Sequence, residues 1–306
     1  MSKINLRSNK ASGQGIKIKS TGEKIFDACL NVFGVILVAI VLYPIYYVFI
    51  ASVSKPLYVE NGSVMFTIIE PTFASYKAAV KTPFLWTSLG NSLIYTLGGV
   101  LVNMVFSTLM AYGLSKQRLV GRKFFTLFTV FTMWFSAGVI PLYMTFRDYS
   151  LLNTRTAILF GFAINTYNMI ILKSFFEQVP ASLEEAAFID GASDFRIFAQ
   201  IYLPLSKPSL ATVSLFYMVN RWNGYFWPMN LLTEDSKVPL QVLLKKLLVD
   251  RTANEMEAAI ITAQSLSSQT TVIYALIILA IIPMAIIYPF VQKYFKAGLT
   301  IGANKG

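Results

Sequence analysis

The 306-residue sequence contains no histidine and only one cysteine, Cys29. Without histidine, the chain has neither a Ser-His-Asp triad nor a histidine-based metal site. One cysteine excludes an intramolecular disulfide and a cysteine metal cluster, so we expect Cys29 to serve packing in its apolar run. No G-x-x-x-x-G-K-[ST] pattern occurs, which excludes ATP hydrolysis through a P-loop. We therefore expect a chain that is not an enzyme and holds no cofactor or metal of its own.

Charged residues are also scarce. They make up 13% of the chain, while 55% of the residues are hydrophobic. Soluble domains average about 25% charged residues, so this composition indicates an integral membrane protein. The formal net charge of +11 has no soluble basic domain to carry it, which argues against a nucleic-acid partner. In a membrane protein such an excess is expected in the cytoplasmic loops.

Six apolar stretches are long enough to cross a bilayer, and they predict an all-α membrane protein with six transmembrane helices. They cover about 28–51, 84–115, 124–146, 156–172, 209–232 and 270–291. The first is too long for the core of a signal peptide. The small pair Gly98-Gly99 in the second would permit close helix approach.

Basic clusters mark one side of the predicted topology. They lie before the first span, at 116–123 and after the sixth span. By the positive-inside rule this side is the cytoplasm, which places both termini there. The predicted parts are a cytoplasmic tail (1–23), the first span with an external loop (24–83), a core (84–292) and a cytoplasmic tail (293–306). No internal repeat is evident, which disfavours secondary transporters built from inverted repeats.

The loop 180–208 carries a helix-turn-helix pattern. Ser182 and Glu185 have the spacing of a capping box, and Gly191 stands where a left-handed residue would end the first helix. Ser193 is positioned to cap a second helix. There Phe195, Phe198 and Ile201 or Tyr202 would form one apolar face, and Pro204 would end the helix. Such a surface suits docking into a groove on another protein.

The sequence Glu185-Ala186-Ala187, then Gly191, then Ile201-x-Leu203-Pro204 resembles the cytoplasmic EAA loop of binding-protein-dependent ABC import permeases, with matching spacing throughout. In that family the loop is the coupling helix, which sits in a cleft of the ATP-hydrolysing subunit. The alternative is a helical hairpin that merely connects two spans. The resemblance assigns ATPase coupling to Glu184, Glu185, Ala186, Ala187, Asp190, Gly191, Ala192, Ile201, Leu203 and Pro204.

A polar group interrupts the fifth predicted span. Asn220, Arg221, Trp222 and Asn223 could hydrogen-bond sugar hydroxyls or stack on sugar faces, which makes them candidates for a translocation path. The alternative for Arg221 is pairing with another helix or with backbone carbonyls that holds the bundle together. The run from Trp222 to Pro228 resembles the fifth span of sugar-type ABC permeases. Asn91, Asn103 and Asn165 are expected to form interhelical hydrogen bonds.

The tail from Gly298 to Gly306 is similar to that of maltose-type permeases, where it reaches between the two ATPase subunits. The resemblance thus covers nearly the whole chain. It implies the type I ABC importer permease fold and a carbohydrate-type importer, nearest to the branch for complex oligosaccharides. The implied mechanism is alternating access, with a multi-pass location in the plasma or inner membrane of a prokaryote. The implied partners are a second permease subunit in a heterodimer, two ATPase subunits that hold ATP–Mg, an external solute-binding protein and a sugar or oligosaccharide.

Three alternatives remain at this point. An ABC permease for amino acids, peptides or an oxyanion differs only in cargo. A secondary transporter or channel would usually carry acidic residues inside its spans, and here these are nearly absent. A membrane-embedded enzyme would need a histidine, metal or carboxylate constellation that the sequence does not provide.

Overall fold

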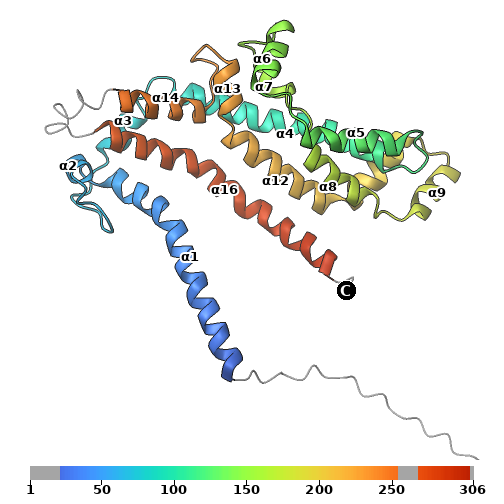
Figure 1. Cartoon of the computed structure of the whole chain (residues 1–306), viewed down its shortest axis with the longest axis horizontal. Coiled ribbons are helices and arrows are strands. Elements are labelled where there is room, and N and C mark those ends of the chain that lie inside the picture. The colour runs from blue at the N-terminus through green and yellow to red at the C-terminus, as the bar shows by residue number, and fades with distance from the viewer. Residues whose placement is uncertain (1–20, 254–267, 304–306) are drawn as a thin grey trace, which may run out of the picture. The chain divides into compact units, whose positions relative to one another are not determined.

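The computed structural model describes residues 21–253 and 268–303, and these form helices and loops without strands (Figure 1). The all-α prediction is therefore confirmed for this part of the chain. In order, the helices are α1 (Thr21–Val53), α2 (Pro56–Glu60), α3 (Ala74–Ala79), α4 (Leu85–Ser115), α5 (Arg122–Trp134), α6 (Val139–Asp148), α7 (Arg155–Phe160), α8 (Thr166–Phe176), α9 (Ala181–Ile189), α10 (Asp194–Ile197), the π-helical turn η1 (Phe198–Tyr202), α11 (Leu203–Leu205), α12 (Lys207–Asn223), α13 (Phe226–Leu231), α14 (Leu240–Ala253) and α16 (Gln269–Ala303).

The chain divides into two units, 1–47 and 48–306. In the first unit, the described residues belong to α1, and their apolar side chains are exposed on all sides. A helix that is apolar all round requires a nonaqueous environment or a partner. Cys29 is itself exposed on this helix, so the packing role expected for it is not met within the described chain.

In the second unit, α4 is the central element. It lies beside α8 and α12, and the figure shows these helices running together (Figure 1). Three apolar clusters are built along it. Its C-terminal end packs with α8, α10, η1 and α12, its middle with α6, α7 and α13, and its N-terminal end with α3, α14 and α16. Helix α4 therefore contributes side chains to all three apolar clusters of this unit.

Buried polar side chains tie α4 to its neighbours. Asn91 donates to the carbonyl oxygens of Ser236 and Val238 at 2.8 and 3.2 Å, and the hydroxyl oxygens of Ser107 and Tyr217 are 2.6 Å apart. Those two carbonyls belong to the loop before α14, but Arg155 on α7 donates to Asn91 Oδ1 at 3.1 Å, so the predicted interhelical hydrogen bond of Asn91 is confirmed. The side chain of Asn165 instead accepts from the backbone nitrogen of Asn168 at 3.1 Å. It caps α8, because it stands at a helix start that the apolar stretch 156–172 did not reveal.

Among the described residues, three helices are long and apolar enough to cross a membrane: α1, α4 and α16. The number rises to four if α5 and α6 form one bent span, with an angle of 114° between them. Gly138, with a φ of +89°, lies at this break, in a conformation that favours glycine. The stretches 156–172 and 209–232 are also interrupted, between α7 and α8 and between α12 and α13. The number of spans and the side of the termini stay predictions.

Candidate functional site

The loop 180–208 folds as two helical segments about a turn at Gly191. Its φ of +75° is left-handed, and the backbone nitrogen of Ala192 closes the turn on the carbonyl oxygen of Ala187 at 2.9 Å. The prediction that Gly191 ends the first helix in a left-handed conformation is confirmed. Adding a Cβ at Gly191 would meet nothing within 4 Å, so the backbone conformation, and not space, requires glycine here.

Of the two predicted helix caps, one is confirmed and the other is wrong. Ser193 accepts a hydrogen bond from the backbone nitrogen of Arg196 at 3.4 Å and caps α10, as predicted. The capping box of Ser182 and Glu185 is wrong. Helix α9 begins two residues earlier than a cap at Ser182 would place it, at Ala181, with Pro180 at the cap position and no side-chain cap. Proline has no N–H to satisfy and sets the entry to the helix by its fixed backbone angle, so Ser182 lies inside the first turn.

The second helical segment buries fewer of the predicted residues and extends further than expected. Phe198 and Tyr202 are 6% and 4% exposed, but Phe195 is 72% exposed and does not join the apolar face. Phe195 is the second residue of α10, in the first turn after the cap at Ser193, before the segment reaches the bundle. The prediction that Pro204 ends the helix is also wrong, because helical backbone continues to Leu205. The π-helical turn η1 directly precedes it, and its wider backbone accommodates a residue that cannot donate.

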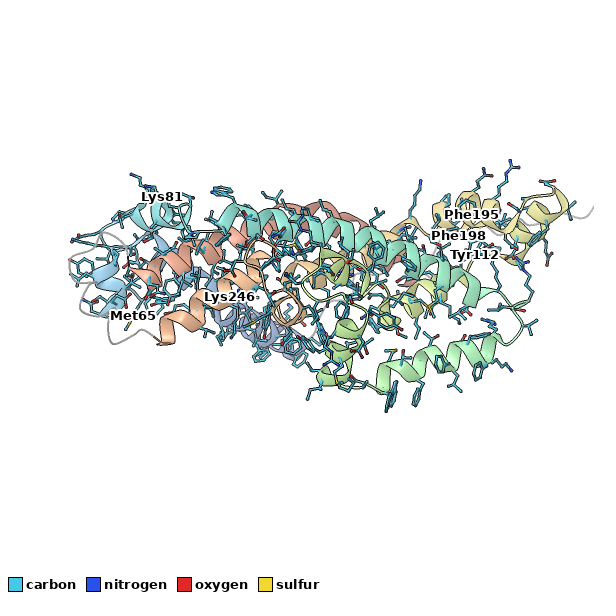
Figure 2. All side chains as sticks on the ribbon, turned by 90° about the horizontal axis from the view of Figure 1, so that it is seen from above. Met65, Lys81, Tyr112, Phe195, Phe198 and Lys246 are labelled. Carbon is cyan, nitrogen blue, oxygen red and sulfur yellow. The ribbon has the colours of Figure 1, made fainter. Side chains whose placement is uncertain are left out.

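Glu184 anchors α9 to the end of α4. Its Oε2 atom lies 2.7 Å from the Nζ atom of Lys116 and accepts from the hydroxyl of Tyr202 at 2.6 Å. The Lys116 ammonium is enclosed between two aromatic rings, 3.6 Å from the ring centre of Tyr202 and 4.1 Å from that of Tyr112. Figure 2 shows Tyr112, Phe198 and Phe195 together at one end of the unit, with Met65 and Lys81 at the opposite end.

Two further charged residues, Arg118 and Asp194, lie beside this cluster. Arg118 pairs with Asp194 and approaches Glu184 Oε1 at 3.7 Å. Burial raises the pKa of Glu184, but the hydrogen bonds from Lys116 and Tyr202 outweigh it and hold that pKa below its ordinary value. Burial lowers the pKa of Lys116 despite the opposing effect of Glu184. At 2.7 Å the two groups form an ion pair, and the lowered pKa of Glu184 preserves its negative charge toward acidic pH.

The other residues of the EAA pattern divide into two sets. Glu185, Ala186, Asp190 and Pro204 are exposed, so they are available to a partner. The remaining apolar members are partly buried against the cluster at the end of α4: Ala187, Ala192, Ile201 and Leu203. The pattern therefore presents one face outward and holds the other to the bundle. The coupling role of these residues stays a prediction.

A cavity of about 890 Å³ lies among α4, α7, α8, α12 and α13. Three of the four residues predicted for a translocation path line it: Asn220, Arg221 and Asn223. Trp222 does not, because its ring is buried and its Nε1 atom donates to the carbonyl oxygen of Ala280 at 3.3 Å. Asn165, Asn168 and Tyr217 also line the cavity, although the sequence did not single them out for that role.

Arg221 is bonded to the break in the fourth predicted span. It donates to the carbonyl oxygens of Ile158, Leu159 and Phe162, and its Nε atom donates to Asn103 Oδ1 at 2.9 Å. Carbonyls at a helix end lack partners within the helix, and here an arginine supplies them. Asn103 adds hydrogen bonds to Phe162 and Ala163 at 2.6 and 2.8 Å. Arg221 therefore holds the break together while it borders the cavity.

Lys116 is the functional candidate that the sequence did not identify as such. It was grouped with the basic residues at 116–123, which served only to assign the side of the membrane. Its partner Glu184 lies 68 residues away, so no local spacing joins them. The tail from Gly298 onward offers no test of its predicted role, since 304–306 lie outside the described residues.

Comparison with known proteins then decides the family. The model of the family described as "Binding-protein-dependent transport system inner membrane component" matches residues 13–301. The chain belongs to this family. This permease is 38% identical over 285 residues to the polygalacturonan/rhamnogalacturonan transport system permease protein YtcP of Bacillus subtilis (strain 168), covering 92% of this chain and 99% of that one. It is 37% identical to protein LplC of the same organism, over 92% and 96% of the two chains.

A solved structure agrees with the fold of this permease. One chain of a bacterial ABC transporter involved in the import of the acidic polysaccharide alginate superimposes with a TM-score of 0.84 at 43% sequence identity. The match covers 90% of this permease and 99% of that chain. The predicted type I ABC permease fold and the predicted family are thereby confirmed, and the chain is a transport component.

Proposed function

We propose that this permease is a transmembrane subunit of an ATP-driven importer of oligosaccharides, with acidic oligosaccharides as its substrate class. The observation that carries the proposal is the cavity of about 890 Å³ bordered by Arg221. A volume of this size lies in the range of ligand sites in proteins. The names of the relatives, which include transporters of polygalacturonan and alginate, support the same class.

The lining of the cavity suits a sugar. The amide side chains of Asn165, Asn168 and Asn223 offer both donors and acceptors for hydroxyl groups. Tyr225 and Trp227 add flat rings with a polar edge, which can pack against the apolar face of a pyranose ring. This combination of apolar surface with a few orienting polar groups is typical of a small-molecule site.

The charge of the lining favours an acidic sugar. Arg221 is the charged residue among the described side chains that line the cavity, and no aspartate or glutamate lies with it. Its hydrogen bonds go to three carbonyls and one amide, and no described carboxylate forms an ion pair with it. A partly desolvated cation without a carboxylate gains energy from an anion nearby, since the local dielectric is low. A uronate carboxylate provides that charge.

The remaining parts of the importer are proposed from the family. Two ATPase subunits would hold ATP–Mg and receive the exposed face of the EAA pattern. A second permease would complete the path, and a solute-binding protein outside would deliver the sugar. The chain would cross the plasma membrane of a prokaryote six times, with both termini in the cytoplasm. The exposed side chains of Glu185, Ala186 and Asp190 support the position given to the ATPase.

Uptake by cells that lack and then regain this gene tests the proposal. The probe is a labelled oligogalacturonide, and its matched control is the same oligomer with every carboxyl group reduced to an alcohol. We expect uptake to require the gene and to fall about tenfold or more for the reduced oligomer, the effect of roughly 1.4 kcal/mol. Equal uptake of both oligomers would remove the acidic preference. Gene-dependent uptake of neither would show that the substrate class is wrong.

A further inference from the structure

We propose that Lys116 and Glu184 form the joint through which movement of α9 reaches α4, so that Lys116 is a positioning residue for the coupling of transport to ATP hydrolysis. The proposal rests on the proposed function. It concerns a contact within this chain, away from the outward-facing residues of the EAA pattern. The cluster of Lys116, Glu184, Tyr112 and Tyr202 is called the α4–α9 joint below.

Apart from this cluster and from Arg118, which lies 4.7 Å from the ring centre of Phe188, helix α9 makes few contacts with the bundle. None of its residues is buried, and Phe188 and Ile189 are exposed. Ala187 supplies a partly buried apolar contact, but its side chain is a single methyl group. A helix with so few apolar contacts would slide or tilt easily under load from a partner. The charged contact at Glu184 therefore has a large share in its attachment.

The joint is enclosed, unlike a surface ion pair. The side chains of Lys116 and Glu184 are 8% and 16% exposed, and two tyrosine rings flank the ammonium group. Exposed ion pairs contribute little because water screens them and because two long side chains must be ordered. Here the rings restrict both side chains, and Tyr202 fixes the carboxylate with its hydroxyl. Removing Lys116 leaves Glu184 with the longer and more exposed ion pair to Arg118, at 3.7 Å, so the enclosed contact to α4 is lost.

The two residues of the ion pair belong to helices that both have a proposed role in transport. Glu184 stands beside Glu185, in the helix proposed to face the ATPase. Lys116 is the capping residue at the C-terminal end of α4. The same helix carries Tyr95 and Asn103, which line the cavity. A displacement of α9 that pulls on Lys116 therefore acts on the helix that shapes the cavity.

The chain supplies a matched control for a substitution at Lys116. Lys173 is similarly enclosed, with a side chain 13% exposed, and its Nζ atom also lies 2.7 Å from a glutamate, Glu177. That pair lies four residues apart in and next to α8, so it does not connect α9 to α4. Lys116→Met and Lys173→Met remove the same charge from comparable environments. Lys116→Arg retains the charge and the aromatic contacts, and Tyr202→Phe removes only the hydroxyl donor.

The experiment measures uptake and ATP hydrolysis in vesicles that contain the complete transporter, per purified complex. For Lys116→Met we expect the ATPase subunits to remain bound and the ratio of sugar imported to ATP hydrolysed to fall roughly tenfold, a usual size for coupling between two sites. Lys116→Arg and Lys173→Met should keep the wild-type ratio, and Tyr202→Phe should lower it less. A purely structural role would reduce the amount of complex and leave the ratio unchanged.

Several results would contradict the proposal that the α4–α9 joint transmits movement. One is a wild-type ratio in both Lys116→Met and Tyr202→Phe, and another is an equal loss in Lys173→Met. Loss of the ATPase subunits from Lys116→Met would mean that the residue builds the docking surface and does not transmit movement. The proposed function fails separately, if the wild-type vesicles bind no ATPase subunit or import no sugar.

Discussion

Arg221 occupies space that only a glycine on α4 leaves open. A Cβ added at Gly99 would lie 2.8 Å from the Nε atom of Arg221 and 3.0 Å from its Cδ atom. The guanidinium group cannot easily yield, because Asn103 and three carbonyls hold it. The small pair at 98–99 indicated close approach, and the structure shows that the neighbour at Gly99 is this side chain.

The first prediction concerns Gly99→Ala. We expect the substitution to destabilise the protein by about 1–3 kcal/mol, the usual cost of overpacking, because the added methyl group displaces Arg221 from its carbonyls. Thermal unfolding of the purified protein in detergent measures the effect. Gly90→Ala in the same helix is the control, since its Cβ would meet nothing within 4 Å. It should raise stability by about 0.5–1 kcal/mol through helix propensity alone. Equal effects at both positions would contradict this role of Gly99.

Single residues also mark the limit of prediction from sequence. A charge inside an apolar stretch identified Arg221 as important, and backbone carbonyls were one of its two expected partners. Which carbonyls it binds depends on the break between α7 and α8, and hydropathy does not reveal that break. Trp222 next to it was assigned to the same path, yet its ring turns toward α16. Neighbours in a helix point about 100° apart, so a residue next to one that lines a cavity can face a different helix, as Trp222 does.

At the scale of elements, the turn at Gly191 controls the angle between α9 and α10. The second prediction is that Gly191→Val abolishes coupled uptake without unfolding the spans. A β-branched residue pays roughly 1–2 kcal/mol in the left-handed conformation, which is enough to change the turn but not the bundle. Uptake and the thermal midpoint in detergent are measured together.

Gly191→Asn is the matched control, because asparagine tolerates left-handed backbone and the site has room for a side chain. It should retain most of the uptake. Normal uptake by the valine variant would mean that this turn does not transmit force.

The third prediction separates the two serines of the loop. Ser193→Ala removes the cap of α10 and should cost about 1 kcal/mol, whereas Ser182→Ala removes no cap. Amide hydrogen exchange over 194–205 should accelerate about fivefold in the first variant, which corresponds to that free energy. In the second variant, exchange over 181–189 should stay close to wild type. Faster exchange over 181–189 in Ser182→Ala would show that Ser182 does cap α9, and would contradict the cap position at Pro180.

Elements were predictable where local chemistry decides them. The glycine turn and the serine cap follow from backbone angles and from unsatisfied amides at a helix start, and both were found. The prediction for Pro204, by contrast, was wrong. The rule that proline ends a helix assumes α-helical spacing, and here five π-helical residues precede it. That turn packs Phe198 and Tyr202 into the cluster at the end of α4, so tertiary contacts outweighed the local rule.

At the scale of the whole molecule, two topologies differ in how often the chain crosses the membrane. If α1, α4, the pair α5–α6 and α16 are the spans, the chain crosses four times. The described segment 149–253, including the EAA pattern, would then lie on the outer side. If the interrupted helices α7–α8 and α12–α13 also cross, the total is six and the EAA pattern faces the cytoplasm. Both models place the termini on one side, so the termini cannot distinguish them.

Packing favours six crossings. Helices α8 and α12 lie along α4, one of the long apolar helices, and Tyr217 on α12 connects to Ser107 on α4 at 2.6 Å. Helix α12 has 17 residues, which at about 1.5 Å per residue reaches most of the way across a hydrocarbon core of about 30 Å. Arg221 and Asn103 satisfy the carbonyls at the break before α8, as backbone inside a bilayer requires.

The fourth prediction uses single cysteines in a Cys29→Ser background and a maleimide that does not cross membranes. We expect Asn61→Cys to react on intact cells, while Gln117→Cys and Asp190→Cys react only after permeabilisation; all three positions are exposed in the chain. Asp190 decides between the models, because four crossings place it outside and six place it inside. Labelling of Asp190→Cys on intact cells, with Gln117→Cys protected, would exclude six crossings. It would also separate the EAA pattern from any cytoplasmic ATPase, since the two would lie on opposite sides of the membrane.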